Sequence, residues 1–135
     1  MDEKNEKILK YLRKDGRASY TEIAEEIGVS EGTVRNRVEK MKQDGVIEKF
    51  SVETGTAGPK AVVMVKLETG KDIDQVLKKF PGQIQIKEVT GGYDLILEVE
   101  RPSNQEINDV LDEIRSIDGV DSTETYMVLN ERKES

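Results

Sequence analysis

The sequence predicts an α+β protein made of two small parts, because two kinds of hydrophobic period follow one another along the chain. Apolar residues recur at helical spacing up to about residue 43, whereas β-forming runs alternate with helical stretches beyond residue 60. A stretch rich in glycine and proline separates the two. We expect folded parts at 1–52 and 60–129, a linker at 53–59, and a polar tail at 130–135.

The N-terminal part is expected to begin with helices over residues 3–14 and 20–27. Apolar residues on a single stripe at helical spacing mark the first of them. Ser19 and Glu22 have the spacing of a capping box, in which the two side chains satisfy backbone N–H groups at a helix start. They therefore predict where the second helix begins.

A third helix is expected over residues 31–43, with Ser30 as its N-cap and Asp44-Gly45 at its end. Only a short turn containing glycine separates it from the second helix. Residues 46–52 are rich in β-forming side chains and lack a helical period, so we expect a strand there. Helix, turn, helix and strand in this order predict a winged helix-turn-helix.

The second part is expected to fold as βαββαβ, the arrangement of ferredoxin-like domains. The strands should cover residues 61–67, 84–89, 93–99 and 120–129, and the helices residues 73–80 and 107–117. Right-handed crossovers place both helices on one face of the sheet. Val62, Met64 and Ile96 would then lie on the other face, where a second copy of the chain is the simplest cover. We therefore expect a homodimer.

Composition narrows the classes of function. The chain has no cysteine and no histidine, so we expect no catalytic residue, no metal site and no cofactor. It has no apolar run of membrane-spanning length and a charged start unlike a signal peptide, which predicts a cytoplasmic protein without a membrane partner. The net charge of −7 arises after residue 50, because residues 1–50 hold 11 basic and 11 acidic side chains. The N-terminal part can therefore still bind phosphates.

The third helix is the one that enters the major groove of DNA in a helix-turn-helix. Its core side should carry Val34, Val38 and Met41, because these residues fall on one stripe at about 100° per residue. The residues expected to contact base edges are Gly32, Thr33, Arg35 and Asn36, and those expected to contact phosphates are Arg37, Lys40 and Lys42. Arginine binds guanine and asparagine binds adenine in a bidentate manner.

The same helix has a simpler interpretation. A helix that carries Arg and Lys is more often a solvated face than a nucleic-acid contact. Arg37 could form an internal salt bridge to Glu22 or Glu26 instead of binding a phosphate. The ordered succession of cap, turn, second cap and β-forming segment nevertheless favours DNA binding.

A second candidate site is the turn from Thr90 to Asp94. Gly91 and Gly92 permit positive φ and a close approach of backbone to a ligand, and Asp94 places a carboxylate at the edge of the turn, next to Tyr93. The alternative is a plain hairpin turn with an exposed aspartate. The residues of the turn alone favour this plain turn.

Seven short stretches along nearly the whole chain match those of a known family. They are 15–19, 22–24, 28–30, Val34, 37–38, 45–47 and 90–95. In these stretches the chain resembles the feast/famine (leucine-responsive, AsnC-type) transcription regulators of bacteria and archaea. The resemblance implies a regulator that binds double-stranded DNA through residues 30–40, which adds Ser30 to the expected DNA contacts.

The resemblance also implies a role for the second part. It would build homodimers, tetramers or octamers and hold an amino-acid effector between subunits. The effector would lie close to Gly91, Gly92, Tyr93 and Asp94, with Asp94 as a partner for its ammonium group.

Two other functions are compatible with some of these features. An architectural protein that coats or bends DNA without an effector would share everything in residues 1–50. Ferredoxin-like domains also occur in enzymes such as acylphosphatases, which need an arginine in a glycine-rich anion loop. Here Tyr93 and Asp94 follow the glycines, and an acidic group is the wrong charge for a phosphate.

Overall fold

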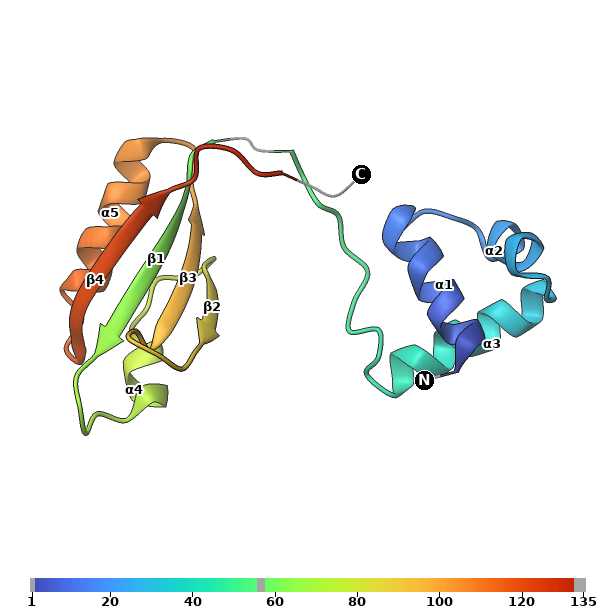
Figure 1. The fold of residues 1–135 in the computed structure, drawn as a ribbon, viewed down its shortest axis with the longest axis horizontal. Coiled ribbons are helices and arrows are strands. Elements are labelled where there is room, and N and C mark those ends of the chain that lie inside the picture. The colour runs from blue at the N-terminus through green and yellow to red at the C-terminus, as the bar shows by residue number, and fades with distance from the viewer. Residues whose placement is uncertain (1, 56–57, 133–135) are drawn as a thin grey trace. The chain divides into compact units, whose positions relative to one another are not determined.

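The computed structural model describes residues 2–55 and 58–132. The chain divides into two compact units, residues 1–54 and residues 55–135. The first is helical and the second is built on a β-sheet (Figure 1). In the described part of the chain, no helix is both long and apolar enough to span a bilayer.

The N-terminal unit contains the three expected helices, α1 (Glu3–Lys14), α2 (Tyr20–Ile27) and α3 (Glu31–Gln43). Each begins at a side-chain oxygen that accepts a hydrogen bond from a backbone N–H in the first turn. The caps are Asp2 with Asn5 (2.8 Å), Ser19 with Glu22 (3.1 Å) and Ser30 with Thr33 (3.1 Å). Helices this short are marginal alone, so the caps and the packing between helices stabilise them.

The core of this unit lies where the apolar stripes of the three helices meet. Ile8 from α1 and Ile23 from α2 are fully buried against Val34 and Val38 of α3, and Met41 is nearly so. The turn from α2 to α3 passes through Gly28, whose φ of 78° lies in the left-handed region that favours glycine. The side of α3 that the sequence predicted to be buried is therefore confirmed.

The strand predicted over residues 46–52 is wrong, because the described chain makes no β-pair there. β-forming side chains stabilise a strand only when a neighbouring strand completes the hydrogen-bond ladder, and the described N-terminal unit contains none. The Ile47 N–H donates instead to the Met41 carbonyl, 3.0 Å away, and the Ile47 side chain packs on the helical core. Val46, Phe50 and Val52 remain exposed.

The C-terminal unit has the expected βαββαβ order. Its elements are β1 (Lys60–Leu67), α4 (Ile73–Leu77), β2 (Gln85–Glu88), β3 (Leu95–Glu100), α5 (Asn104–Arg115) and β4 (Val120–Met127). The four strands form one antiparallel sheet in the order β2-β3-β1-β4. The α+β fold predicted for this part of the chain is confirmed.

Helix α4 is shorter than predicted and ends at Leu77 rather than at Phe80. The N–H groups of Lys79 and Phe80 donate three residues back, to Val76 and Leu77, so the chain tightens into turns there. Pro81 follows, and the residue before a proline is disfavoured in the α conformation. The tight turns end the helix one turn early.

The core of the C-terminal unit lies on one face of the sheet. Alternate residues of β1 and β3, including Val63, Val65 and Leu97, are fully buried and pack with side chains of α4 and α5. Helix α5 runs along this face next to β4 (Figure 1). The prediction that both helices cover the same face is confirmed.

The other face of the sheet carries an apolar patch. Met64 lies opposite Ile96 on β3, and Val62 lies opposite Tyr126 on β4. The first three side chains are half-buried and Tyr126 is 52% exposed. We call these four residues the far-face patch. No helix among the described residues of this unit covers the patch, because both of its helices pack on the opposite face.

Candidate nucleic-acid interface

Helix α3 presents four of the eight predicted DNA-contact residues on one exposed side. Because Val34, Val38 and Met41 are buried, the remaining side of the helix is open to solvent. The predicted DNA contacts on it are Gly32, Arg35, Asn36 and Lys40, all of them exposed, and the exposed Glu39 lies among them. Gly32, Asn36 and Lys40 recur four positions apart and Arg35 lies beside Asn36, so the four contacts form one continuous strip along the helix. We call these four residues the α3 strip.

The first turn of α3 is organised by Ser30 and Thr33. The Ser30 hydroxyl accepts from the Thr33 N–H, and the two hydroxyl groups are hydrogen-bonded at 2.9 Å. Both residues were predicted to contact DNA, and in this structure their side chains complete the N-cap. A hydroxyl oxygen can accept a second hydrogen bond, so both hydroxyl groups can still form a hydrogen bond with DNA while they complete the cap.

Arg35 is held by two neighbours. Its guanidinium donates to the Glu31 carboxylate one turn earlier on α3. It also lies over the ring of Tyr20 at the start of α2, with Cζ 5.3 Å from the ring centroid. The Arg35 side chain is nevertheless 58% exposed, so its guanidinium remains accessible from solvent.

Arg37 lies off the α3 strip and points toward α1. Its guanidinium donates to Asp2 Oδ2 at 2.6 Å and to Asn5 Oδ1 at 3.2 Å, and its side chain is 29% exposed. The N–H of Asn5, followed by the Arg37 guanidinium, lowers the pKa of Asp2 from its ordinary value. Arg37 therefore forms an internal ion pair with Asp2, whereas the partners suggested by sequence were Glu22 and Glu26.

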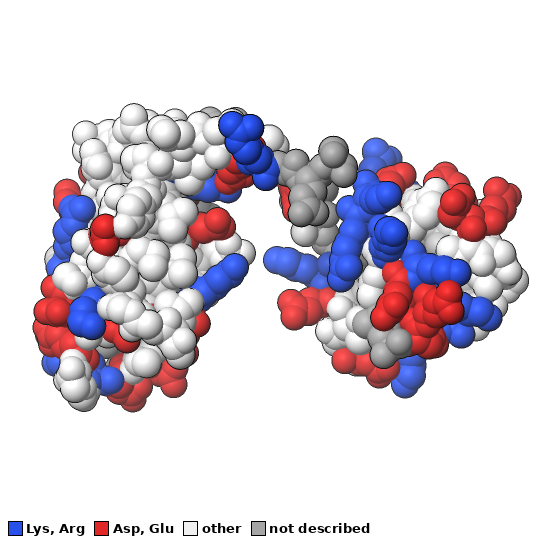
Figure 2. Space-filling view, viewed as in Figure 1, with Lys and Arg blue, Asp and Glu red and all other residues white. Residues whose placement is uncertain are grey.

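The two predicted phosphate-binding lysines lie close to acidic groups on the same helical segment. Lys40 is 3.4 Å from Asp44, and Lys42 is 3.6 Å from Glu39. All four side chains are at least 47% exposed, and exposed pairs of this kind contribute little to stability. Basic side chains project from the helical unit among acidic ones (Figure 2). These lysines can exchange their acidic neighbours for a phosphate at small cost.

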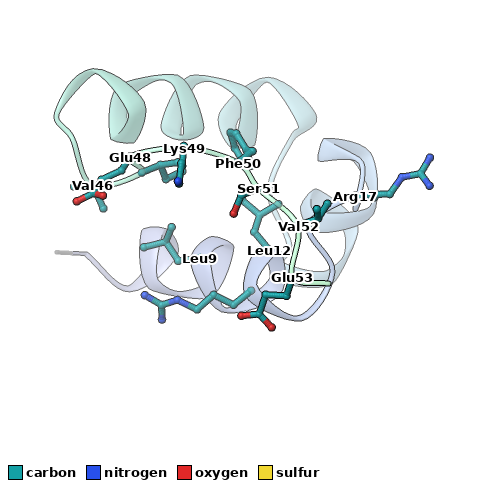
Figure 3. Close-up of a pocket in the computed structure, with 13 residues that line it drawn as sticks. Leu9, Leu12, Arg17, Val46, Glu48, Lys49, Phe50, Ser51, Val52 and Glu53 are labelled. Carbon is teal, nitrogen blue, oxygen red and sulfur yellow. The ribbon is translucent and has the colours of Figure 1, made fainter. Parts of the chain in front are cut away.

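A shallow groove runs between α1 and residues 46–53. Leu9 and Leu12 point from α1 toward the irregular segment, which contributes Val46, Phe50 and Val52 (Figure 3). Basic side chains also line it, namely Arg13, Arg17 and Lys49. None of the predicted site residues lies in this groove.

In the C-terminal unit, Asp94 extends the hydrogen bonding between β1 and β3. Its Oδ2 accepts from the Leu67 N–H at 2.8 Å, and its own N–H donates to the Val65 carbonyl at 2.9 Å. Its carbonyl accepts from the Val89 N–H at 2.9 Å. Gly91, with a φ of 127°, turns the chain just before it. One carboxylate oxygen of Asp94 is thus engaged within the fold.

The other residues of this turn differ in their surroundings. Gly91 and Gly92 are exposed, whereas Tyr93 is half-buried. The Tyr93 hydroxyl donates to Glu124 on β4, and the Tyr126 hydroxyl donates to the same carboxylate. These two bonds, that from Tyr126 first, lower the pKa of Glu124, and the same bonds raise the pKa of both tyrosines.

The partners of Arg35 and Arg37 were not predicted from the sequence. Glu31 stands four positions before Arg35, and this helical spacing could have pointed to the pair. Tyr20 and Asp2 reach α3 only through the way the helices cross, which no local spacing reveals. Within residues 2–55 and 58–132, no cluster of three or more acidic side chains is arranged to hold a metal ion.

Comparison with known proteins gives the same division of the chain. Residues 1–48 match the family model described as winged helix-turn-helix DNA-binding, and residues 60–135 match the Lrp/AsnC ligand binding domain. The chain is 35% identical to the HTH-type transcriptional regulator FL11 of Pyrococcus horikoshii, covering 100% of this chain and 93% of that protein. It is 38% identical to the regulator LysM of Saccharolobus solfataricus, covering 96% and 94%.

Solved structures agree with these relatives. Escherichia coli AsnC, 29% identical, superposes with a TM-score of 0.85 over 100% of this chain and 96% of that one. A Neisseria meningitidis regulator solved in complex with L-Met has the same fold, with a TM-score of 0.86 at 23% identity over 100% and 94%. The chain therefore belongs to the Lrp/AsnC family of helix-turn-helix transcription regulators.

Proposed function

We propose that this protein regulates transcription by binding double-stranded DNA with the α3 strip in the major groove. The proposal rests on one observation: one side of α3 is buried, with Val34, Val38 and Met41 in the core, and the opposite side, with the α3 strip, is exposed. Arg35 and Asn36 carry the bidentate groups that distinguish guanine and adenine. Gly32 has no side chain, and a Cβ there would have only Ser30 Oγ as a neighbour, 4.0 Å away, so the backbone can come close to a base pair.

The phosphate contacts come from the residues around the strip. Lys40 and Lys42 are exposed and paired only weakly, so each can bind a phosphate. Ser30 and Thr33 lie at the start of α3, where hydroxyl groups commonly bind the DNA backbone. Arg37 would have to leave Asp2 to reach a phosphate, and we assign its main effect to holding α3 against α1.

The far-face patch supports a homodimer. Val62, Met64 and Ile96 occupy a face that the helices of this unit leave open, and a second copy of the sheet offers a matching apolar surface. A two-fold dimer would present two α3 helices to half-sites roughly 34 Å apart on one side of the DNA. Larger assemblies of the same dimers fit the proposal.

An amino acid is the proposed effector, bound near Gly91, Gly92, Tyr93 and Asp94. The family model for residues 60–135 is named for ligand binding, and one protein of the same fold was solved with L-Met. Exposed glycine backbone can bind a carboxylate, and the Asp94 carboxylate can pair with an ammonium group. DNA binding and ligand sensing require no catalytic group, and the proposal assigns none.

Selection of binding sites from a pool of randomised duplex DNA, with and without candidate amino acids, tests the proposal. We expect the full-length protein to enrich a sequence with two related half-sites and to protect it as a defined footprint. Enrichment of no sequence, with protection that spreads along any duplex, would show an architectural DNA-binding protein instead.

A further inference from the structure

Arg35 differs from the other residues of the α3 strip because two side chains hold its guanidinium. Tyr20 lies under it at the start of α2, and Glu31 binds it from the first turn of α3. Asn36, the other residue suited to bidentate base contacts, has no side-chain partner among the described residues. The structure therefore singles out one base-contacting group for orientation before any DNA is bound.

The two neighbours leave part of the guanidinium available. Glu31 accepts from Nη2 of Arg35, whereas Nη1 and Nε have no hydrogen-bond partner among the described residues. Arg35 Cζ lies over the Tyr20 ring, 5.3 Å from its centroid, in a cation–π arrangement that needs no hydrogen-bond acceptor. An arginine held by a ring and through one nitrogen loses fewer conformations when its remaining N–H groups bind a base.

Glu31 has a second effect through its charge. A carboxylate beside Arg35 offsets the positive charge that attracts any phosphate, and it lies at the end of α3 that would enter the groove. Removing this negative charge should strengthen binding to every duplex, whatever its sequence. Tyr20 carries no charge and should affect only the orientation of Arg35.

We propose that Tyr20 and Glu31 are positioning residues that orient Arg35, so that sequence preference depends on all three side chains together. This inference rests on the proposed function of α3 as the DNA-recognition helix. Neither residue needs to contact a base itself. Together they determine how sharply the protein distinguishes its operator from other DNA.

The test measures the ratio of affinities for two duplexes. One duplex carries the site that the wild-type full chain selects from randomised DNA, and the other is a scrambled duplex of the same composition, at the same salt concentration. We expect Tyr20→Leu and Glu31→Gln each to lower this ratio by about two- to fivefold, the range for exposed cation–π and ion-pair contacts. Tyr20→Phe keeps the ring and should keep the ratio.

Asp44→Asn is the matched control for charge. Asp44 follows the end of α3, is 50% exposed and pairs with Lys40 rather than with Arg35. Its substitution changes the net charge as Glu31→Gln does, so it should strengthen binding to both duplexes and leave their ratio unchanged. An equal fall of the ratio in both variants would show a general charge effect and overturn the role of Glu31.

The decisive comparison repeats the substitutions in an Arg35→Ala background. If Tyr20 and Glu31 act through Arg35, they should no longer change the ratio there. An undiminished effect in that background, or no effect in the wild type, would overturn the inference. If Arg35→Ala alone left the sequence preference unchanged, the α3 strip itself would be wrongly assigned. Should Tyr20→Leu prove poorly folded by circular dichroism, Glu31→Gln, at a half-buried position, provides the same test.

Discussion

Two substitutions of Asp94 distinguish its contribution to the stability of the fold from its contribution to binding a ligand. Asp94→Ala removes the acceptor of the Leu67 N–H, which lies 2.8 Å from Oδ2 in a half-buried part of the sheet. Leaving such a group unpaired costs about 1–3 kcal/mol. Asp94→Asn keeps an oxygen that can accept the same hydrogen bond and removes only the charge. We therefore expect a clear loss of stability for alanine and a loss of less than about 1 kcal/mol for asparagine.

Urea unfolding followed by circular dichroism measures this difference directly. The midpoint for Asp94→Ala should fall below that of Asp94→Asn without a change in slope, because both variants expose the same surface on unfolding. Calorimetry with amino acids is then informative for the asparagine variant, which keeps the fold and lacks the proposed partner for an ammonium group. Its binding heat should vanish if the charge is required.

Two results would refute this reasoning. Equal stability of Asp94→Ala and the wild type would mean that the carboxylate does not complete the ladder between β1 and β3. Unchanged amino-acid binding by Asp94→Asn would mean that the charge of Asp94 has no part in recognising a ligand. Each result concerns one role of the side chain and leaves the other open to its own measurement.

Three further measurements address the DNA contact, the dimer and the ion pair between α1 and α3. Arg35→Ala should weaken binding to the selected site by about 1–3 kcal/mol, whereas Lys40→Ala should weaken specific and random binding alike and reduce the salt slope by about 1. Met64→Lys places a charge in the far-face patch and should yield smaller particles in light scattering; an unchanged mass would exclude this face as the dimer contact. The lowered pKa of Asp2 means that its bonds to the Asn5 N–H and to the Arg37 guanidinium contribute stability above the ordinary pKa of 3.8, and that this contribution is lost as the pH falls through the folded-state value. Asp2→Asn should therefore reduce the loss of stability on acidification, as measured by thermal melts across pH 2–6.

The elements that could be predicted from sequence are those determined by local signals. Ser19 and Ser30 cap helices because the spacing of cap and first turn is local, and the core side of α3 follows from its own period. The alternation along β1 likewise predicted which side chains would be left on the open face of the sheet. In each case the chemistry of neighbouring residues is sufficient.

The errors and omissions depend on partners distant in sequence. Residues 46–52 have the composition of a strand, but a strand also needs a neighbour, which the described N-terminal unit lacks. Asp2 and Arg37 are 35 positions apart, and only the crossing of α1 and α3 brings them together. The turn at Asp94 suggested a free carboxylate, whereas the structure uses one of its oxygens as a substitute for a backbone acceptor.

Residues 46–52, which form neither helix nor strand, also determine where the protein can be cut into its two units. Residues 48–52 are exposed and make no backbone hydrogen bond among the described residues, which is the condition a protease needs to bind a chain in extended form. Lys49 lies within this stretch. Brief treatment with trypsin should therefore cut the intact protein first at Lys49. The products would be a helical fragment that retains α3 and a larger fragment that retains the whole sheet, ready for separate study of DNA binding and assembly.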